Sequence, residues 1–248
     1  YAPPEYAPAV ARPPVIDRDH ITFGCFNTLS KITPEVVELW CDVLRAAPKS
    51  RLVLKCKAFE DADLQERYRA MFAADGIDSS RLELRGFSAH RQMLGEYGDI
   101  DIALDPFPVS GAMTSCEALW MGVPVVTLPG ERPVSRQTLA FLTALERTEW
   151  AAETPEDYVA IAHGLAGDAN RLAAFRTEQR QRMAASPLCD GPRFTRGLEA
   201  AYRDMLRRWC AARPADAAPD ASARAPDRRL RLGYVSPAFG ESPARLFL

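Results

Sequence analysis

Small and polar residues gather where a strand-like run gives way to a helical one. The strand-like run is 100–105, and the segment 109–117 follows it with the sequence Val-Ser-Gly-Ala-Met-Thr-Ser-Cys-Glu. The first turn of a helix leaves backbone N–H groups without intrahelical acceptors, and the helix dipole favours an anion there. Glu117, about one turn into the helix, is placed to accept hydrogen bonds from a sugar diol. The segment therefore predicts a pocket for the phosphates and ribose of a nucleotide diphosphate.

A second loop carries a cation that suits the same ligand. Asn27, Thr28 and Lys31 follow the strand predicted over 21–26, and Lys31 comes just before the next predicted helix. The Lys31 ammonium group would neutralise a phosphate; the alternative is a solvated surface lysine. Because a cation near a helix N-terminus is mildly unfavourable, we favour a ligand partner for Lys31.

A third loop follows the strand predicted over 81–85 and contains Ser88 and His90. Its backbone groups are predicted to read the edge of a nucleobase, with His90 adding a contact. Ser88 could equally cap the short helix that follows, and His90 could be an exposed surface histidine.

The small-residue segment also has a plain alternative. Gly111 would belong to a tight turn, Thr114 or Ser115 would cap the helix, and Glu117 would be a solvated helix position. We favour the ligand interpretation because the loop follows the carboxyl end of a strand, which is where open α/β sheets bind ligands.

Other acidic residues are weaker candidates. Asp99 and Asp101 spell D-x-D, a metal-and-nucleotide signature in some glycosyltransferases, but they lie at the amino end of a predicted strand. Asp105, at the other end, is better placed, although Asp before Pro is also a common turn former. Ser135 is predicted to cap the helix that follows it. The six cysteines form no C-x-x-C pair and only three histidines are present, so no metal site is predicted.

The composition is that of an ordinary globular protein. The 248 residues are 47% apolar and 26% charged, with a net charge of −2, which argues against nucleic-acid binding. No apolar run approaches membrane-spanning length, so no membrane partner is predicted. The cysteines are predicted to be reduced, which favours a cytoplasmic location.

Strand-like and helical segments alternate from residue 21, which is typical of a Rossmann-like parallel sheet with helices on both faces. Strands are predicted over 21–26, 51–56, 81–85, 100–104 and 123–128. Helices are predicted from Pro34, within 112–122, and over 60–74, 90–97, 135–145, 155–165, 169–184 and 192–210.

Composition also predicts the domain boundaries. Residues 1–20, rich in Pro and Ala, read as an extended connector, and 21–210 as one α/β lobe. An Ala/Pro linker is predicted over 211–229, and the strand-like start of another module over 230–248. Both ends of the chain are expected to be cuts in a longer polypeptide.

Three long motifs include these strands and the loops that follow them: Phe-Gly-Cys-Phe-Asn-x-x-x-Lys at 23–31, Asp-Ile-Ala-Leu-Asp-Pro-Phe-Pro at 101–108 and Cys-Glu-Ala-Leu-Trp-Met-Gly-Val-Pro-Val-Val-Thr-Leu-Pro-Gly-Glu at 116–131. They resemble the carboxyl-terminal lobe of protein O-linked N-acetylglucosamine transferases, in the bacterial and SPINDLY-type branch. The resemblance covers about residues 1–210. It implies one lobe of a two-lobed GT-B fold, usually preceded by tetratricopeptide repeats.

The resemblance also implies a reaction: inverting, metal-independent transfer of a sugar from UDP-N-acetylglucosamine to protein Ser or Thr hydroxyls, with no cofactor. Lys31 would hold the donor diphosphate and stabilise it as leaving group. Ser88 and His90 would lie on the loop that contacts uracil, and Glu117 would bind the ribose. The donor-binding set is completed by Asn27, Thr28, Gly111, Ala112, Met113 and Thr114. The partners implied are the UDP-sugar, a protein acceptor and an amino-terminal lobe.

Some residues depart from the family pattern. The phosphate loop usually reads Gly-Thr-Thr or His-Thr-Thr, whereas here Met113 replaces a hydroxyl, and Ser242 stands where the amino-terminal lobe has a histidine. These departures favour an alternative: a degenerate nucleotide-binding or scaffold module without transferase activity. A third hypothesis is another GT-B enzyme, such as a sugar-nucleotide epimerase.

Overall fold

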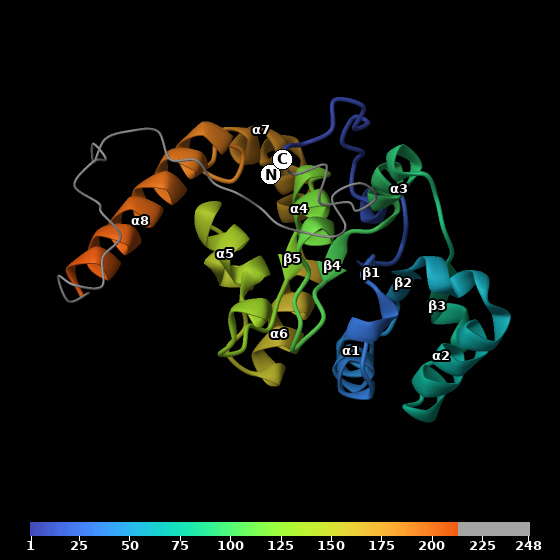
Figure 1. Cartoon of the computed structure of the whole chain (residues 1–248). Coiled ribbons are helices and arrows are strands. Elements are labelled where there is room, and N and C mark those ends of the chain that lie inside the picture. The colour runs from blue at the N-terminus through green and yellow to red at the C-terminus, as the bar shows by residue number, and fades with distance from the viewer. Residues whose placement is uncertain (213–248) are drawn as a thin grey trace. The chain divides into compact units, whose positions relative to one another are not determined.

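The computed structural model describes residues 1–212, and a parallel sheet forms their centre (Figure 1). Its strands are β1 (Thr22–Cys25), β2 (Arg51–Lys55), β3 (Leu82–Arg85), β4 (Ile102–Leu104) and β5 (Val125–Val126). Their order is β3-β2-β1-β4-β5, and each neighbouring pair is parallel. The α/β class is therefore confirmed, although each strand is shorter than predicted.

Helices cover both faces of this sheet. They are α1 (Pro34–Ala46), α2 (Ala62–Ala74), α3 (His90–Glu96), α4 (Met113–Trp120), α5 (Gln137–Ala144), α6 (Pro155–Ala166) and α7 (Ala169–Ala184). A further helix, α8 (Gly191–Ala211), follows them in the chain and has no buried residue. In Figure 1, α1, α2 and α6 lie below the sheet and α3, α4 and α7 above it. Contacts of α1 with α2 and α6, and of α4 with α5 and α7, agree with these two layers.

Local sequence signals explain where several helices begin. Pro34 opens α1 at the position where its missing N–H costs nothing, and Asp61 caps α2 by accepting from the N–H groups of Asp63 and Leu64. The cap predicted at Ser135 is wrong. Arg136 is the N-cap of α5, because the Ser135 hydroxyl accepts from Gly130 N and donates to Arg132 O.

The core links the helices to the carboxyl edge of the sheet. Trp40 of α1 is fully buried, and its Nε1 donates to the Tyr158 hydroxyl of α6 at 3.2 Å. That hydroxyl donates to the Asp105 carbonyl at 3.2 Å, just past β4. The strand order reverses between β1 and β4, and open α/β sheets bind ligands beyond the carboxyl ends at such a point.

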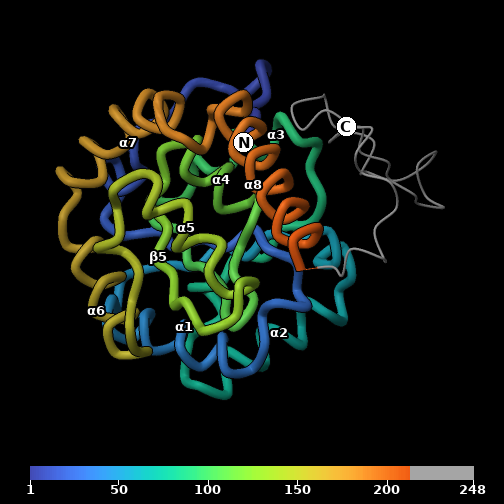
Figure 2. Tube along the Cα trace, turned by 60° about the vertical axis from the view of Figure 1, so that its left-hand side comes forward, coloured from blue at the N-terminus to red at the C-terminus, as the bar shows by residue number. Residues whose placement is uncertain are grey.

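The amino edge of the sheet is closed by the segment before β1. Asp101 is fully buried and accepts from Val15 N at 3.0 Å and Thr22 N at 2.8 Å. Its carboxylate is thus a structural acceptor, which agrees with setting the D-x-D pattern aside. Figure 2 shows the blue start of the trace beside α7, where Arg180 donates to Pro8 O at 2.8 Å.

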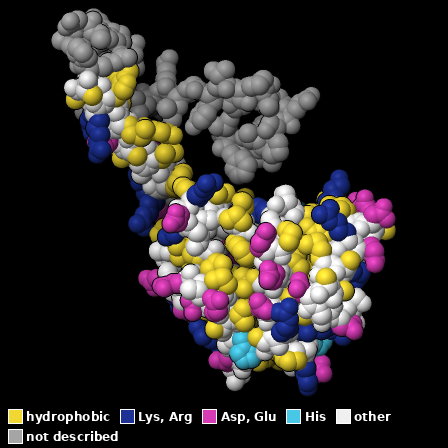
Figure 3. Space-filling model, turned by 90° about the horizontal axis from the view of Figure 1, so that it is seen from below, with side chains coloured by type: hydrophobic (Ala, Val, Ile, Leu, Met, Phe, Trp, Pro, Cys, Tyr) yellow, Lys and Arg dark blue, Asp and Glu magenta, His cyan; other side chains and the backbone are white. Residues whose placement is uncertain are grey.

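The chain divides into two compact units at Arg196 and Gly197, within α8, and the first unit holds the sheet and helices α1 to α7. The predicted linker beyond 212 and the module predicted over 230–248 lie outside the described residues. Among the described helices, none is both long enough and apolar enough to cross a membrane. On the face seen in Figure 3, Lys and Arg side chains are interspersed with Asp and Glu rather than gathered in a basic patch.

Candidate functional site

The loops after β1 and β4 meet at the point where the strand order reverses. Lys31 ends a short 3-10 helix, Leu29–Lys31, and its Nζ donates to Ser110 O at 2.7 Å and to Asn27 Oδ1 at 3.4 Å. Thr114 Oγ1 donates to the same Asn27 oxygen at 3.0 Å. The structure thus brings Lys31, Asn27 and the small-residue loop together, as the order of strands and loops predicts.

The buried carboxylate of Asp105 accepts hydrogen bonds from the small-residue loop. Its carboxylate is 1% exposed and accepts from Gly111 N at 2.7 Å, Ser115 Oγ at 3.3 Å and Thr127 Oγ1 at 2.7 Å. Burial raises the pKa of Asp105, although the hydrogen bonds from Thr127 and Gly111 and the charge of Lys31 act in the opposite direction. Asp105 therefore shapes the loop.

The start of α4 points its first turn into this junction. Ala112 is the N-cap and makes no side-chain cap bond, so the alternative that Thr114 or Ser115 caps the helix is wrong. Their hydroxyls bind Asn27 and Asp105 instead. The N–H groups of this first turn lack intrahelical acceptors and attract an anion. Met113, the first helical residue, is 46% exposed.

Glu117 lies one turn further along α4 and is buried. Its side chain is 5% exposed and its Oε1 lies 2.7 Å from His90 Nε2, so the solvated alternative for Glu117 is wrong. Burial raises the pKa of Glu117, and the hydrogen bond from His90 partly opposes this. His90 is the first residue of α3 and is 42% exposed at its side chain.

A cavity of about 10 Å³ lies at the carboxyl ends of β1 and β4. Its lining includes Asn27, Tyr97, Asp105 and Thr114. Tyr97 stacks on Phe26 with ring centroids 4.4 Å apart, and its hydroxyl donates to Thr114 O at 3.0 Å. This volume is enough for roughly one water molecule, so a nucleotide would bind outside the cavity, against the loops that surround it.

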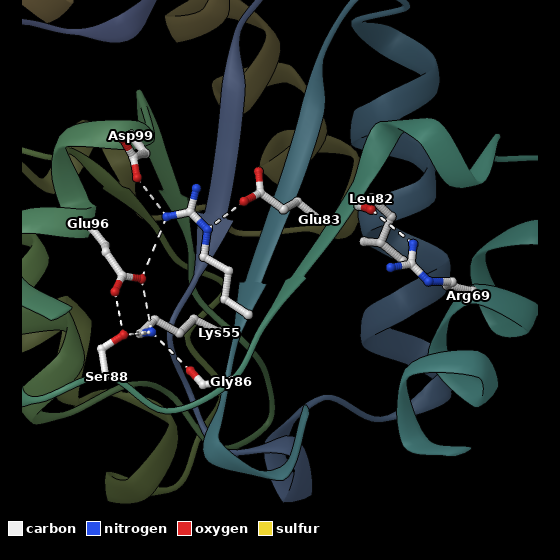
Figure 4. Close-up of polar contacts among 9 residues, drawn as sticks. Lys55, Arg69, Leu82, Glu83, Gly86, Ser88, Glu96 and Asp99 are labelled. Carbon is white, nitrogen blue, oxygen red and sulfur yellow. Dashed lines mark hydrogen bonds and ion pairs between the residues drawn. The ribbon is translucent and has the colours of Figure 1, made fainter. Parts of the chain in front are cut away.

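The Ser88 loop is held by ion pairs that were not predicted from the sequence (Figure 4). Lys55 Nζ donates to Gly86 O at 2.9 Å and to the Ser88 hydroxyl, and it lies 2.9 Å from Glu96 Oε2. Ser88 in turn donates to Glu96 Oε1. Ser88 does not cap α3, whose N-cap is Ala89.

Arg85 joins the same network: its Nη1 lies 3.6 Å from Glu96 Oε2 and 2.7 Å from Asp99 Oδ2. The sequence feature that could have predicted this network is Lys55, a charged residue at the end of the apolar strand β2. Its partners could not be predicted, because they lie far from Lys55 in the sequence. Thr28 precedes the short helix that ends at Lys31; it is exposed, and its hydroxyl lies 3.3 Å from Ser30 Oγ. Among residues 1–212, no group of three or more His, Cys, Asp or Glu side chains could hold a metal ion.

Gly111 gives a direct test of this loop. A Cβ there would overlap Ser115 Oγ and lie 2.8 Å from Asp105 Oδ1. Gly111→Ala is therefore expected to lower the free energy of unfolding by about 1–3 kcal/mol, as overpacking does. Thermal melts measure this loss. Gly164→Ala is the control, because a Cβ at Gly164 meets no atom within 4 Å; equal melting temperatures for the two variants would contradict the packing described here.

Comparison with known proteins gives sequence matches over most of the chain. Residues 13–198 match glycosyl transferase family 41. The chain is 40% identical over 211 residues to the probable UDP-N-acetylglucosamine--peptide N-acetylglucosaminyltransferase SPINDLY of Hordeum vulgare, covering 85% of this chain and 22% of that protein. It is 31% identical over 198 residues to the UDP-N-acetylglucosamine--peptide N-acetylglucosaminyltransferase of Caenorhabditis elegans. That match covers 80% of this chain and 17% of the nematode protein. The chain thus spans less than a quarter of either relative.

Solved structures resemble the same residues. A mutant of the Thermobaculum terrenum O-GlcNAc transferase superposes with a TM-score of 0.78 at 39% identity, covering 85% of this chain and 40% of that one. A mutant of Staphylococcus aureus TarM, solved with UDP, has a TM-score of 0.54 at 12% identity. That match covers 72% of this chain and 34% of the TarM chain. The second likeness concerns the fold alone.

Proposed function

The chain belongs to glycosyl transferase family 41, and from that premise we propose that residues 21–210 form the UDP-sugar-binding lobe of a GT-B glycosyltransferase. One observation carries the proposal: Lys31 Nζ lies 2.7 Å from Ser110 O, so a cation stands across the strand ends from the N-terminus of α4. A diphosphate between them would meet an ammonium group on one side and helix N–H groups on the other. Glu117, further along α4, is assigned to the ribose.

The proposed reaction is inverting transfer of N-acetylglucosamine from its UDP ester to a protein Ser or Thr hydroxyl. The hydroxyl oxygen attacks the anomeric carbon, and the bond from that carbon to the β-phosphate oxygen breaks. The electron pair leaves with UDP, and the hydroxyl proton passes to a base. Lys31 and the first-turn N–H groups of α4 stabilise the charge that develops on the diphosphate, which preorganised donors do effectively. In this scheme Lys31 takes the place of a metal ion.

The remaining roles are assigned in the same way. The loop that carries Ser88 and His90 contacts uracil, and since the Ser88 hydroxyl is bonded to Glu96, its backbone groups read the base. Asn27, Thr28, Gly111, Ala112, Met113 and Thr114 line the donor. Residues 1–20 connect to an amino-terminal lobe that supplies the acceptor groove. The cysteines of the chain are free thiols, which fits a reducing cytoplasm.

Calorimetry with UDP tests this proposal against a scaffold without nucleotide binding, which the exposed Met113 side chain favours. We expect UDP to bind weakly and Lys31→Ala to abolish most of the heat. A heat unchanged by Lys31→Ala, or no binding at all, would refute the donor-site assignment. Sugar transfer by the full-length protein in excess chelator then tests metal independence.

The raised pKa of Glu117 predicts a pH dependence of ribose binding. The ionised carboxylate accepts hydrogen bonds from a diol better than the protonated acid. Uridine affinity is therefore expected to increase as the pH rises from 4.5, the ordinary value, through the raised pKa of Glu117. Uridine is the probe because it carries no phosphate that titrates. Glu117→Gln should flatten the profile, and an equally steep profile in that variant would count against the assignment.

A further inference from the structure

Tyr6, in the segment before β1, reaches the candidate site through His90. Its hydroxyl lies 2.7 Å from His90 Nδ1, and the other ring nitrogen, Nε2, lies 2.7 Å from Glu117 Oε1. We infer that Tyr6 is a positioning residue of the donor site: through His90 it holds the Glu117 carboxylate in the orientation that accepts a ribose hydroxyl. The inference rests on the proposed function, because it takes the donor ribose as the ligand of Glu117.

The carboxylate fixes the direction of its hydrogen bond with His90, and the tautomer of a neutral His90 then sets the direction of the bond with Tyr6. An ionised Glu117 only accepts, so His90 Nε2 carries a proton and donates to it. In the neutral imidazole Nδ1 is then the acceptor, and the Tyr6 hydroxyl donates to Nδ1. One carboxylate oxygen, Oε1, is thereby committed to His90. The other, Oε2, is assigned to the ribose hydroxyl.

Packing alone does not restrain the imidazole. The side chain of Glu117 is 5% exposed, but that of His90 is 42% exposed. The Tyr6 ring meets the His90 ring edge-to-face, with centroids 5.7 Å apart and planes at 85°. Tyr6 therefore contacts His90 through both its hydroxyl and its ring, on the side away from Glu117. Removing the hydroxyl alone separates these two contributions.

The segment that carries Tyr6 is fixed on both sides of it. A turn is closed by the bond from Ala7 N to Pro4 O at 3.0 Å, and Arg180 Nη2 donates to Pro8 O at 2.8 Å. Before the turn, the Tyr1 ring lies edge-on to Trp120 of α4, with centroids 6.2 Å apart. The hydroxyl is thus presented by an anchored loop, as a positioning role requires.

Calorimetry with UDP on Tyr6→Phe tests the inference. Tyr6→Phe keeps the ring and loses one hydrogen bond, so the dissociation constant is expected to increase about fivefold, with an unchanged melting temperature. In a Glu117→Gln background the same substitution is expected to change the affinity less than twofold, because the two residues act in series. Tyr202→Phe in α8 is the matched control.

The outcomes distinguish this inference from the proposed function. If Lys31→Ala weakens UDP binding and Tyr6→Phe does not, the inference is overturned and the donor site stands. Equal effects of Tyr6→Phe in the wild-type and Glu117→Gln backgrounds, or a lower melting temperature that accounts for the weaker binding, also overturn it. If the wild-type chain binds no UDP, both fail. Without any ligand, the ¹⁵N resonance of His90 Nδ1 should shift in Tyr6→Phe, and an unchanged resonance would contradict the hydrogen bond.

Discussion

Lys31→Met in the full-length protein is expected to lower the kcat of the proposed sugar transfer about 10²–10³-fold, the effect of removing one preorganised donor from a developing charge. The Lys31 ammonium group stands across the β1 and β4 loops from the start of α4, with Ser110 O 2.7 Å away. Methionine keeps much of the side-chain length and removes the charge. In the proposed reaction the diphosphate gains charge as the sugar leaves, so the loss should be larger in kcat than in UDP affinity. Turnover with UDP-N-acetylglucosamine and calorimetry with UDP measure the two effects separately.

Lys49→Met is the control for Lys31→Met. Lys49 is exposed and lies between α1 and β2, at the amino edge of the sheet, so its loss removes a positive charge far from the donor loops. We expect wild-type turnover from this variant. If Lys31→Met and Lys49→Met had the same kcat, Lys31 would have no role in stabilising the leaving group.

Asp105→Ala is expected to lower the free energy of unfolding by about 3 kcal/mol. The substitution leaves the donors Gly111 N and Thr127 Oγ1 buried without their acceptor, and each such group costs about 1–3 kcal/mol. Ser115 loses less, because its hydroxyl also contacts Thr138 Oγ1 at 3.1 Å. In a domain of this size the change corresponds to roughly 6–12 °C in melting temperature. UDP binding should weaken as well, since the loop loses its support.

Asp42→Ala is the matched control for Asp105→Ala, since Asp42 is an exposed residue of α1 paired with Arg45. A surface pair of this kind contributes about 0–1 kcal/mol. Similar melting temperatures for the two variants would mean that the Asp105 hydrogen bonds are not needed to hold the loop. Asp105→Asn adds a second test: its amide has one acceptor oxygen in place of two, so its stability should fall between wild type and Asp105→Ala.

Much of the candidate site could be predicted from the order of strands and loops along the sequence. Parallel strands place their carboxyl ends on one edge, so Lys31 after β1 and Gly111 after β4 were expected to lie close together, and they do. The motifs around these residues predicted the family, which the match over 13–198 confirms. The GT-B lobe is likewise confirmed by the Thermobaculum terrenum structure. The roles of the individual residues toward the donor stay predictions.

Local capping was predicted less well. Ser88, Thr114 and Ser135 were each considered as helix caps because their residue type suits that position. In the structure each hydroxyl bonds to a partner in the surrounding fold or loop, namely Glu96, Asn27 and Arg132. A residue's cap propensity is a local preference of about 1 kcal/mol, and another hydrogen-bond partner of similar strength, in the fold or in the same loop, replaces it.

The sequence by itself determined the alternation of strands and helices and which loops share the carboxyl edge of the sheet, because these follow from periodicity and strand polarity. Its motifs determined the family. Only the tertiary structure decided which side chains hold that edge: Asp105 bonds to the small-residue loop, Lys55 and Glu96 hold the Ser88 loop, and Tyr6 contacts His90. Tyr6 and His90 are 84 positions apart. Such contacts produce no periodic pattern in the sequence, because they depend on how the sheet and its helices pack together.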